Sequence, residues 1–78
     1  MSWPPKRSRF AVDLGALILA GRDARRLTQL AVANHLGVTQ TIVSRWERGV
    51  AQPNAERLVA LVHLLGLDLT NLATEAAA

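Results

Sequence analysis

The 78-residue sequence contains no cysteine, no tyrosine, one phenylalanine and two tryptophans. The lack of cysteine excludes disulfides, thiolate metal sites and cysteine nucleophiles. The scarcity of aromatic residues argues against an aromatic-rich β-sandwich. No apolar run approaches the roughly 20 residues of a transmembrane helix, and the N-terminus lacks the apolar segment and cleavage site of a signal peptide. These absences predict a cytoplasmic protein.

The residues that are abundant favour a small helical domain. Half of the chain is hydrophobic, and the prevalent residues, alanine and leucine, are strong helix formers. The length allows one domain with one modest core. Nine Lys and Arg residues against six Asp and Glu give a net charge of +3, and this excess suits a polyanionic partner.

Capping residues and glycines divide the sequence into helices. Side chains that can accept hydrogen bonds from free helix amides precede four apolar-periodic segments, and glycines that can take a left-handed conformation follow three of them. The expected caps are Asp13, Thr28, Thr39 and Asn54, and the expected terminating glycines are Gly37, Gly49 and Gly66. A short fifth helix is expected from Asp68 or Thr70 through the segment NLATE. Residues 1–10 read as a flexible basic arm and residues 11–78 as the folded domain.

The connection between the second and third helices is very short. Only about three residues, GVT, join them, and this forces the sharp crossing of a helix-turn-helix. Counted from Gln29, the crossing needs a small residue at the fifth position and a positive φ at the ninth, and it needs bulky core residues at the fifteenth and eighteenth. Ala33, Gly37, Val43 and Trp46 occupy those positions.

These motifs resemble the lambdoid phage repressor and Cro helix-turn-helix family. The resemblance is carried by LG at 14–15, LTQ at 27–29, VANHLGVTQTIVSRWERG at 32–49, Pro53 and LVALVHLLGL at 58–67. It covers about residues 13–74. It implies an all-α, compact five-helix bundle that binds double-stranded DNA sequence-specifically, usually as a dimer. Neither enzymatic activity nor a cofactor or metal is expected.

The third helix then resembles a recognition helix, because its polar side chains share one face. Glutamine can form two hydrogen bonds with adenine, and arginine can form two with guanine. Threonine can donate or accept a hydrogen bond, or pack its methyl group against a thymine methyl. The expected base-reading residues are Gln40, Thr41, Ser44 and Arg45. The expected phosphate contacts are Thr28, Gln29, Thr39 and Arg48, with further contacts from the arm residues Lys6, Arg7 and Arg9.

The resemblance also implies an ion pair between Arg22 of the first helix and Glu47 of the third. A homodimer is expected because one recognition helix reads too few base pairs to select an operator. Its expected interface is the leucine-rich C-terminal segment, Leu65, Leu67, Leu69 and Leu72. The apolar outer face of the first helix, at Ile18 and Leu19, is the alternative.

Two functional classes stay open from the sequence. The first is a DNA-binding regulator associated with the nucleoid, of the phage repressor, Cro or restriction-modification controller type. The second is an antitoxin that binds a toxin protein and regulates its own operon. Two features depart from the family pattern: Ala31 stands where a glutamate would complete a capping box after Thr28, and the outer face of the first helix, ALILAG, lacks the usual basic residues. His35 and His63 are too few for a metal site.

Overall fold

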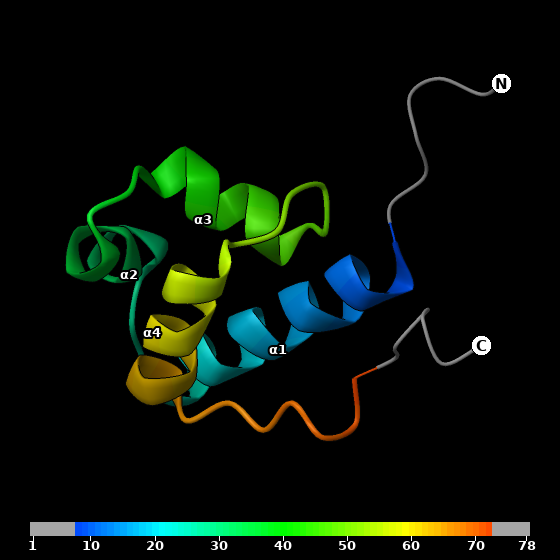
Figure 1. The fold of residues 1–78 in the computed structure, drawn as a ribbon. Helices are drawn as coiled ribbons and strands as arrows, with labels where there is room; N and C mark the ends of the chain where they lie inside the picture. Colours follow the sequence, from blue (N-terminus) through cyan, green and yellow to red (C-terminus); the bar gives the residue numbers. More distant parts are fainter. Residues whose placement is uncertain (1–7, 73–78) are drawn as a thin grey trace, which may run out of the picture.

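The computed structural model describes residues 8–72, which form four α-helices and no strand. They are α1 (Arg9–Ala24), α2 (Gln29–Leu36), α3 (Gln40–Glu47) and α4 (Ala55–Leu65). Figure 1 shows α1 running below α3 and to the right of α4, with α2 set beside the start of α3. None of these four helices combines the length and hydropathy needed to traverse a bilayer.

Each helix begins at a side-chain cap, as the sequence suggested for three of the four. Thr28, Thr39 and Asn54 accept hydrogen bonds from the amides of Ala31, Ile42 and Arg57 at 3.0, 3.3 and 2.8 Å. The prediction for α1 is wrong, because Ser8 rather than Asp13 caps it. The Ser8 hydroxyl accepts from the Ala11 amide at 2.9 Å, so the cap of α1 lies five residues before the expected position.

The expected fifth helix is absent from the described residues, which end at Leu72. The Asp68 carboxylate accepts both the Thr70 amide at 3.0 Å and the Thr70 hydroxyl at 2.7 Å. These two hydrogen bonds lower the pKa of Asp68 and hold a tight local turn, an alternative to helix that Asp and Thr favour. Leu67 and Leu69 pack against the core with a spacing of two, which suits extended chain. The five-helix prediction is therefore corrected to four helices within residues 8–72.

All four helices end in the same backbone motif, in which a left-handed residue redirects the chain. In each, an amide one residue beyond the left-handed position bonds a carbonyl five residues earlier: Leu27 to Arg22, Val38 to Ala33, Val50 to Arg45 and Leu67 to Val62, at 3.0–3.2 Å. Glycines fill three of the left-handed positions, Gly37, Gly49 and Gly66, with φ between 63° and 73°. At the end of α1 the position is taken by Arg26, with φ 55°. This is strained for a residue with a Cβ.

Replacing Arg26 with glycine should therefore stabilise the fold. The left-handed conformation costs an L-residue about 1–2 kcal/mol, and part of that gain is offset by the greater unfolded-state entropy of glycine. We expect the free energy of unfolding to rise by about 0.5–1 kcal/mol in urea denaturation. The matched control is Arg25→Gly, at φ −98°, which should lower stability. If Arg26→Gly were no more stable than the parent, the strain argument would be wrong.

The core lies where α1 faces α3 and α4. One stripe of α1, Ala11, Leu14, Gly15 and Ile18, is buried, at the three- and four-residue spacing of a core-facing helix. It meets Val43 and Trp46 of α3 and Leu61 and Leu65 of α4, with Val32 and Ala33 of α2 completing the core.

Gly15 sets the distance between α1 and α3. A Cβ placed on this residue would meet the backbone carbonyl oxygens of Trp46 and Glu47, the latter at 2.7 Å. The backbone of α1 therefore lies directly against the last turn of α3, which a larger residue would prevent.

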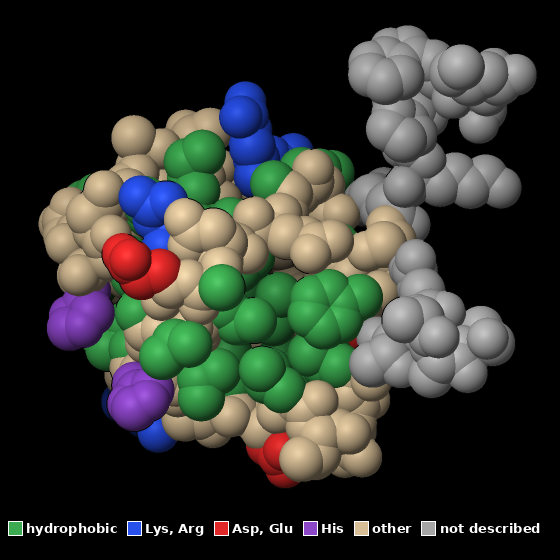
Figure 2. All heavy atoms as spheres, in the orientation of Figure 1, with side chains coloured by type: hydrophobic (Ala, Val, Ile, Leu, Met, Phe, Trp, Pro, Cys, Tyr) green, Lys and Arg blue, Asp and Glu red, His purple; other side chains and the backbone are tan. Residues whose placement is uncertain are grey.

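The C-terminal leucines, which were expected to form a dimer interface, are instead buried or half-buried against this core. Leu65 is 1% exposed and Ile18 is fully buried, so neither can form an interface between copies. Leu67, Leu69 and Leu72 are half-buried and pack on the core. Figure 2 shows that an apolar area remains visible across the face formed by α1 and α4.

Candidate nucleic-acid interface

The two sides of α3 have opposite character. Val43 and Trp46 are buried, at 0% and 3% exposure, and they fix α3 to the core. Gln40, Thr41 and Arg45 are exposed on the other side. Since a helix turns about 100° per residue, packing one face of α3 leaves the hydrogen-bonding face turned to solvent.

The outer side of α3 and the start of α2 enclose a shallow polar hollow. Its lining contains amide, hydroxyl and guanidinium groups and no carboxylate; the residues are Gln29, Gln40, Thr41, Ser44 and Arg48. Of the eight residues of the helix-turn-helix that were expected to touch bases or phosphates, five thus lie together. A neutral-to-cationic hollow with several donors suits an acceptor-rich polyanion.

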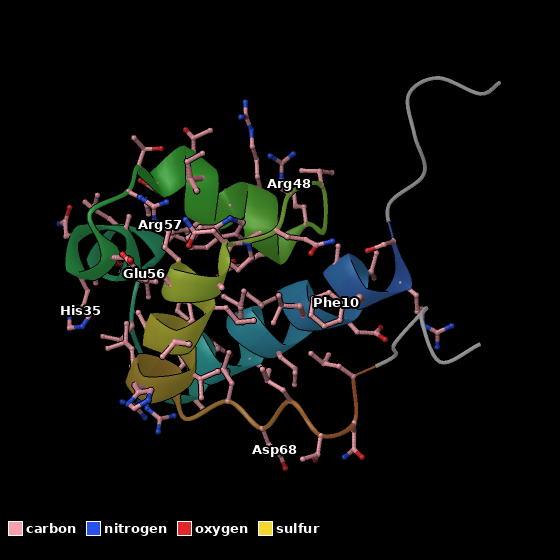
Figure 3. All side chains as sticks on the ribbon, in the orientation of Figure 1. Phe10, His35, Arg48, Glu56, Arg57 and Asp68 are labelled. Atoms are coloured by element: carbon pink, nitrogen blue, oxygen red, sulfur yellow. The ribbon has the colours of Figure 1, made fainter. Side chains whose placement is uncertain are left out.

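Two arginines add positive charge to this side of the molecule. Arg48 follows α3 directly, and its Nε donates to the Ser44 carbonyl at 3.4 Å. Figure 3 shows Arg48 on the side of α3 that faces away from α1. Arg45 lies one turn from Thr41 and is exposed, and its side chain has no hydrogen-bond or ion-pair partner among residues 8–72. Figure 2 shows Lys or Arg side chains standing above α3 on the surface.

A largely buried ion pair anchors the end of α3 to α1. Arg22 Nε donates to Glu47 Oε2 at 2.6 Å, and a second Arg22 nitrogen donates to Oε1 at 3.1 Å. A third donates to the Leu27 carbonyl at 2.9 Å. The side chains are only 16% and 5% exposed. The hydrogen bonds from Arg22 to Glu47 raise the pKa of Arg22.

Gln29 connects this ion pair to the outer face. Its amide nitrogen donates to Glu47 Oε1 at 2.9 Å, and its oxygen accepts from the Gln40 amide at 3.4 Å. The chain of hydrogen bonds Arg22–Glu47–Gln29–Gln40 thus runs from the interior to the first residue of α3. Sequence reasoning treated Gln29 and Gln40 as separate contacts and missed this connection, because only the tertiary crossing of α2 and α3 brings them together.

Thr28 and Thr39 cap the two helices whose N-termini border the hollow. Each hydroxyl accepts a hydrogen bond from one backbone amide in the first turn. The other amides of the first turn have no hydrogen-bond acceptor within their own helix. Those amides and the positive end of the helix dipole favour an anion such as a phosphate. This geometry is compatible with the phosphate contacts expected at Thr28, Gln29 and Thr39.

The remaining predicted residues do not join this site. Lys6 and Arg7 lie outside the described residues. Arg9, expected in a flexible arm, instead lies in the first turn of α1, where its Nε is 3.4 Å from an Asp13 oxygen. His35 is exposed on α2, well apart from Arg48 in Figure 3. Residues 8–72 contain no group of three or more His, Cys, Asp or Glu side chains that could hold a metal.

Comparison with known proteins identifies the fold. The helix-turn-helix family matches residues 18–72. Repressor protein C2 of Salmonella phage P22 is 38% identical over 48 residues, which are 62% of this chain and 22% of that protein. A putative multi-protein-binding factor 1 of Yarrowia lipolytica is 33% identical over 66 residues, 85% of this chain and 41% of that protein. The chain thus spans less than half the length of these curated relatives.

A solved structure gives the same result. The crystal structure of the clp gene regulator ClgR from Corynebacterium glutamicum superposes with a TM-score of 0.73 at 26% identity, covering 92% of this chain and 77% of that chain. A second structure of ClgR gives the same score and covers 92% of both chains. With the family match over most of the described residues and the α2–turn–α3 geometry, the chain belongs to the helix-turn-helix family, which is a family of regulators and not of enzymes.

Proposed function

We propose that this protein is a transcription regulator that binds double-stranded DNA sequence-specifically by placing α3 in the major groove. The observation that carries the proposal is the exposed hydrogen-bonding face of α3, which has no carboxylate and adjoins two capped helix N-termini. Gln40, Thr41, Ser44 and Arg45 would read base edges. Thr28, Gln29, Thr39 and Arg48 would contact phosphates, and these contacts fix the register of α3 in the groove.

The proposal includes assembly as a homodimer on a near-palindromic operator. One copy of α3 reaches only a few base pairs, which is too little information to select one site in a genome. A two-fold dimer would place two copies of α3 at half-sites separated by about 34 Å or a multiple of it. Such a protein would reside with the nucleoid. Phage repressor, Cro-like and restriction-modification controller roles all fit this chemistry.

A change at Arg45 tests the base-reading assignment. A preferred duplex is first selected from a random pool with the parent protein, and binding is then compared on that duplex and on a scrambled one. Arg45→Ala should lose about 1–3 kcal/mol on the preferred duplex and relax the preference at one base pair. Arg25→Ala removes the same charge at the end of α1, where the Arg25 guanidinium lies beside Gly66 at the end of α4, and should retain the preference. Equal losses on both duplexes for Arg45→Ala would make Arg45 a phosphate contact instead.

The salt dependence of binding separates this function from the antitoxin alternative. A protein that neutralises several phosphates loses affinity for random duplex steeply as salt rises. If the parent protein did not bind duplex DNA at low salt, the regulator proposal would fall and a protein-binding function would take its place.

A further inference from the structure

The outward face of α1 carries an apolar stripe that remains exposed in the folded chain. Val12 and Leu19 are 42% and 45% exposed, and Ala16 and Ala20 are also exposed. Across residues 14–21 α1 contains no polar residue. At about 100° per residue these side chains share roughly a third of the helix surface. Small and medium apolar side chains arranged this way allow another helix to approach closely.

Charges of opposite sign bound the stripe at equal distances from its centre. Arg9 lies seven residues before Ala16, and Asp23 lies seven residues after it. The Arg9 side chain is 75% exposed while it contacts Asp13 on the same helix, and Asp23 is exposed. The stripe is therefore complementary to itself when one copy is reversed.

We propose that this face of α1 binds the same face of a second copy, with the two helices antiparallel about Ala16. In this register Ala16 meets Ala16, Val12 meets Ala20 of the second copy, and Arg9 lies opposite Asp23 of the second copy. A parallel arrangement would instead bring Arg9 against Arg9, where like charges repel. The interface is isologous, so one patch serves both partners.

The same arrangement leaves both α3 helices accessible from one side. Gly15 packs on α3, and Ala16 follows it by one residue, so the stripe faces about a quarter-turn away from α3 around the α1 axis. A two-fold axis directed from α1 towards α3 reverses the α1 helices while keeping both outer faces of α3 on the same side (Figure 1). This inference deepens the proposed DNA-binding homodimer and rests on it, by naming the surface through which the copies meet.

Cysteine cross-linking tests the register, because the chain has no cysteine of its own. Helices packed 8–10 Å apart with a Cα radius of about 2.3 Å would place the two Ala16 Cα atoms roughly 4–5 Å apart, close to the range of a disulfide. Under mild oxidation at micromolar concentration, Ala16→Cys should form a disulfide dimer at least tenfold faster than Val59→Cys. Val59 is 58% exposed on α4 and Ala16 is also exposed, so both thiols would be accessible to solvent.

Charge exchange tests the antiparallel pairing. In the Ala16→Cys background, Arg9→Glu or Asp23→Arg alone should slow disulfide formation severalfold, and the double change should restore it. Leu19→Asp should also slow it while leaving the helical content and the affinity for random duplex unchanged. These comparisons do not depend on an operator. Failure of the parent protein to bind duplex would therefore refute the proposed function without deciding the interface.

Two results would overturn the inference. One is Ala16→Cys cross-linking no faster than Val59→Cys, including the case in which the parent protein sediments as a dimer through another surface. The other is a double charge exchange that remains as slow as the single changes, which would remove the antiparallel register.

Discussion

Gly15→Ala should destabilise the protein by about 3 kcal/mol or prevent folding, although alanine is the better helix former by about 1 kcal/mol. The added methyl would overlap the Trp46 carbonyl and approach the Glu47 carbonyl to 2.7 Å. Both are backbone atoms inside α3, so α1 and α3 would have to separate. Overpacking of this kind typically costs 1–3 kcal/mol and at times more. Circular dichroism during urea denaturation measures the loss.

Gly21 provides the matched control on the same helix. A Cβ there would meet Leu67 Cδ2 at 2.8 Å and Leu65 Cβ at 3.1 Å. The first contact is the end of a side chain that can rotate away. Gly21→Ala should therefore be much milder than Gly15→Ala, within about 1 kcal/mol of the parent. Equal effects at the two positions would show that the α1–α3 backbone approach does not limit the fold.

Glu47→Ala should be the most destabilising change outside the apolar core, with a loss of about 3 kcal/mol. Removing one member of a buried ion pair leaves the charge of the other buried and uncompensated. Such changes typically lower the free energy of unfolding by about 3–5 kcal/mol. Here Arg22 would retain only the Leu27 carbonyl, and Gln29 would lose the acceptor of its amide. Denaturation at neutral pH measures the effect, and the protein should also bind its preferred duplex less well because Gln29 and Gln40 lose their support.

The exposed ion pair of α1 gives the comparison for this prediction. Arg9 and Asp13 lie 3.4 Å apart with 75% and 34% exposed side chains, and surface pairs contribute little in water. Asp13→Ala should change stability by less than about 0.5 kcal/mol. A similarly small effect for Glu47→Ala would mean that the pair orients α3 without stabilising the fold.

Local sequence signals predicted most of the helix boundaries. Thr28, Thr39 and Asn54 act as caps through bonds to residues three positions away, so their role is visible in a short window of sequence. Ser8 was missed because the preceding prolines and basic residues suggested a flexible arm. The fifth helix was predicted from capping chemistry at Asp68, but the same carboxylate instead closes a turn with Thr70.

The hydrogen-bonding face of α3 was also predictable, because its periodicity separates Val43 and Trp46 from the polar residues. The hydrogen bonds that hold this face in position were not predictable. Gln29 and Glu47 are 18 residues apart, and Gln29 and Gln40 are 11 apart. Their contacts arise only from the crossing of two helices. Likewise, the left-handed conformation of Arg26 could not be predicted from the sequence, because residues other than glycine rarely adopt a positive φ.

The unequal support of the α3 side chains has a consequence for how such a protein could acquire new targets. The Gln40 side chain donates a hydrogen bond to Gln29, and Gln29 donates one to Glu47. A change at Gln40 therefore also disturbs Gln29, whose side chain contacts the Arg22–Glu47 ion pair. Thr41 and Arg45 donate to no side chain among residues 8–72. After duplication of the gene, we expect changes in operator preference to begin at Thr41 and Arg45. We expect Gln29 and Gln40 to be retained.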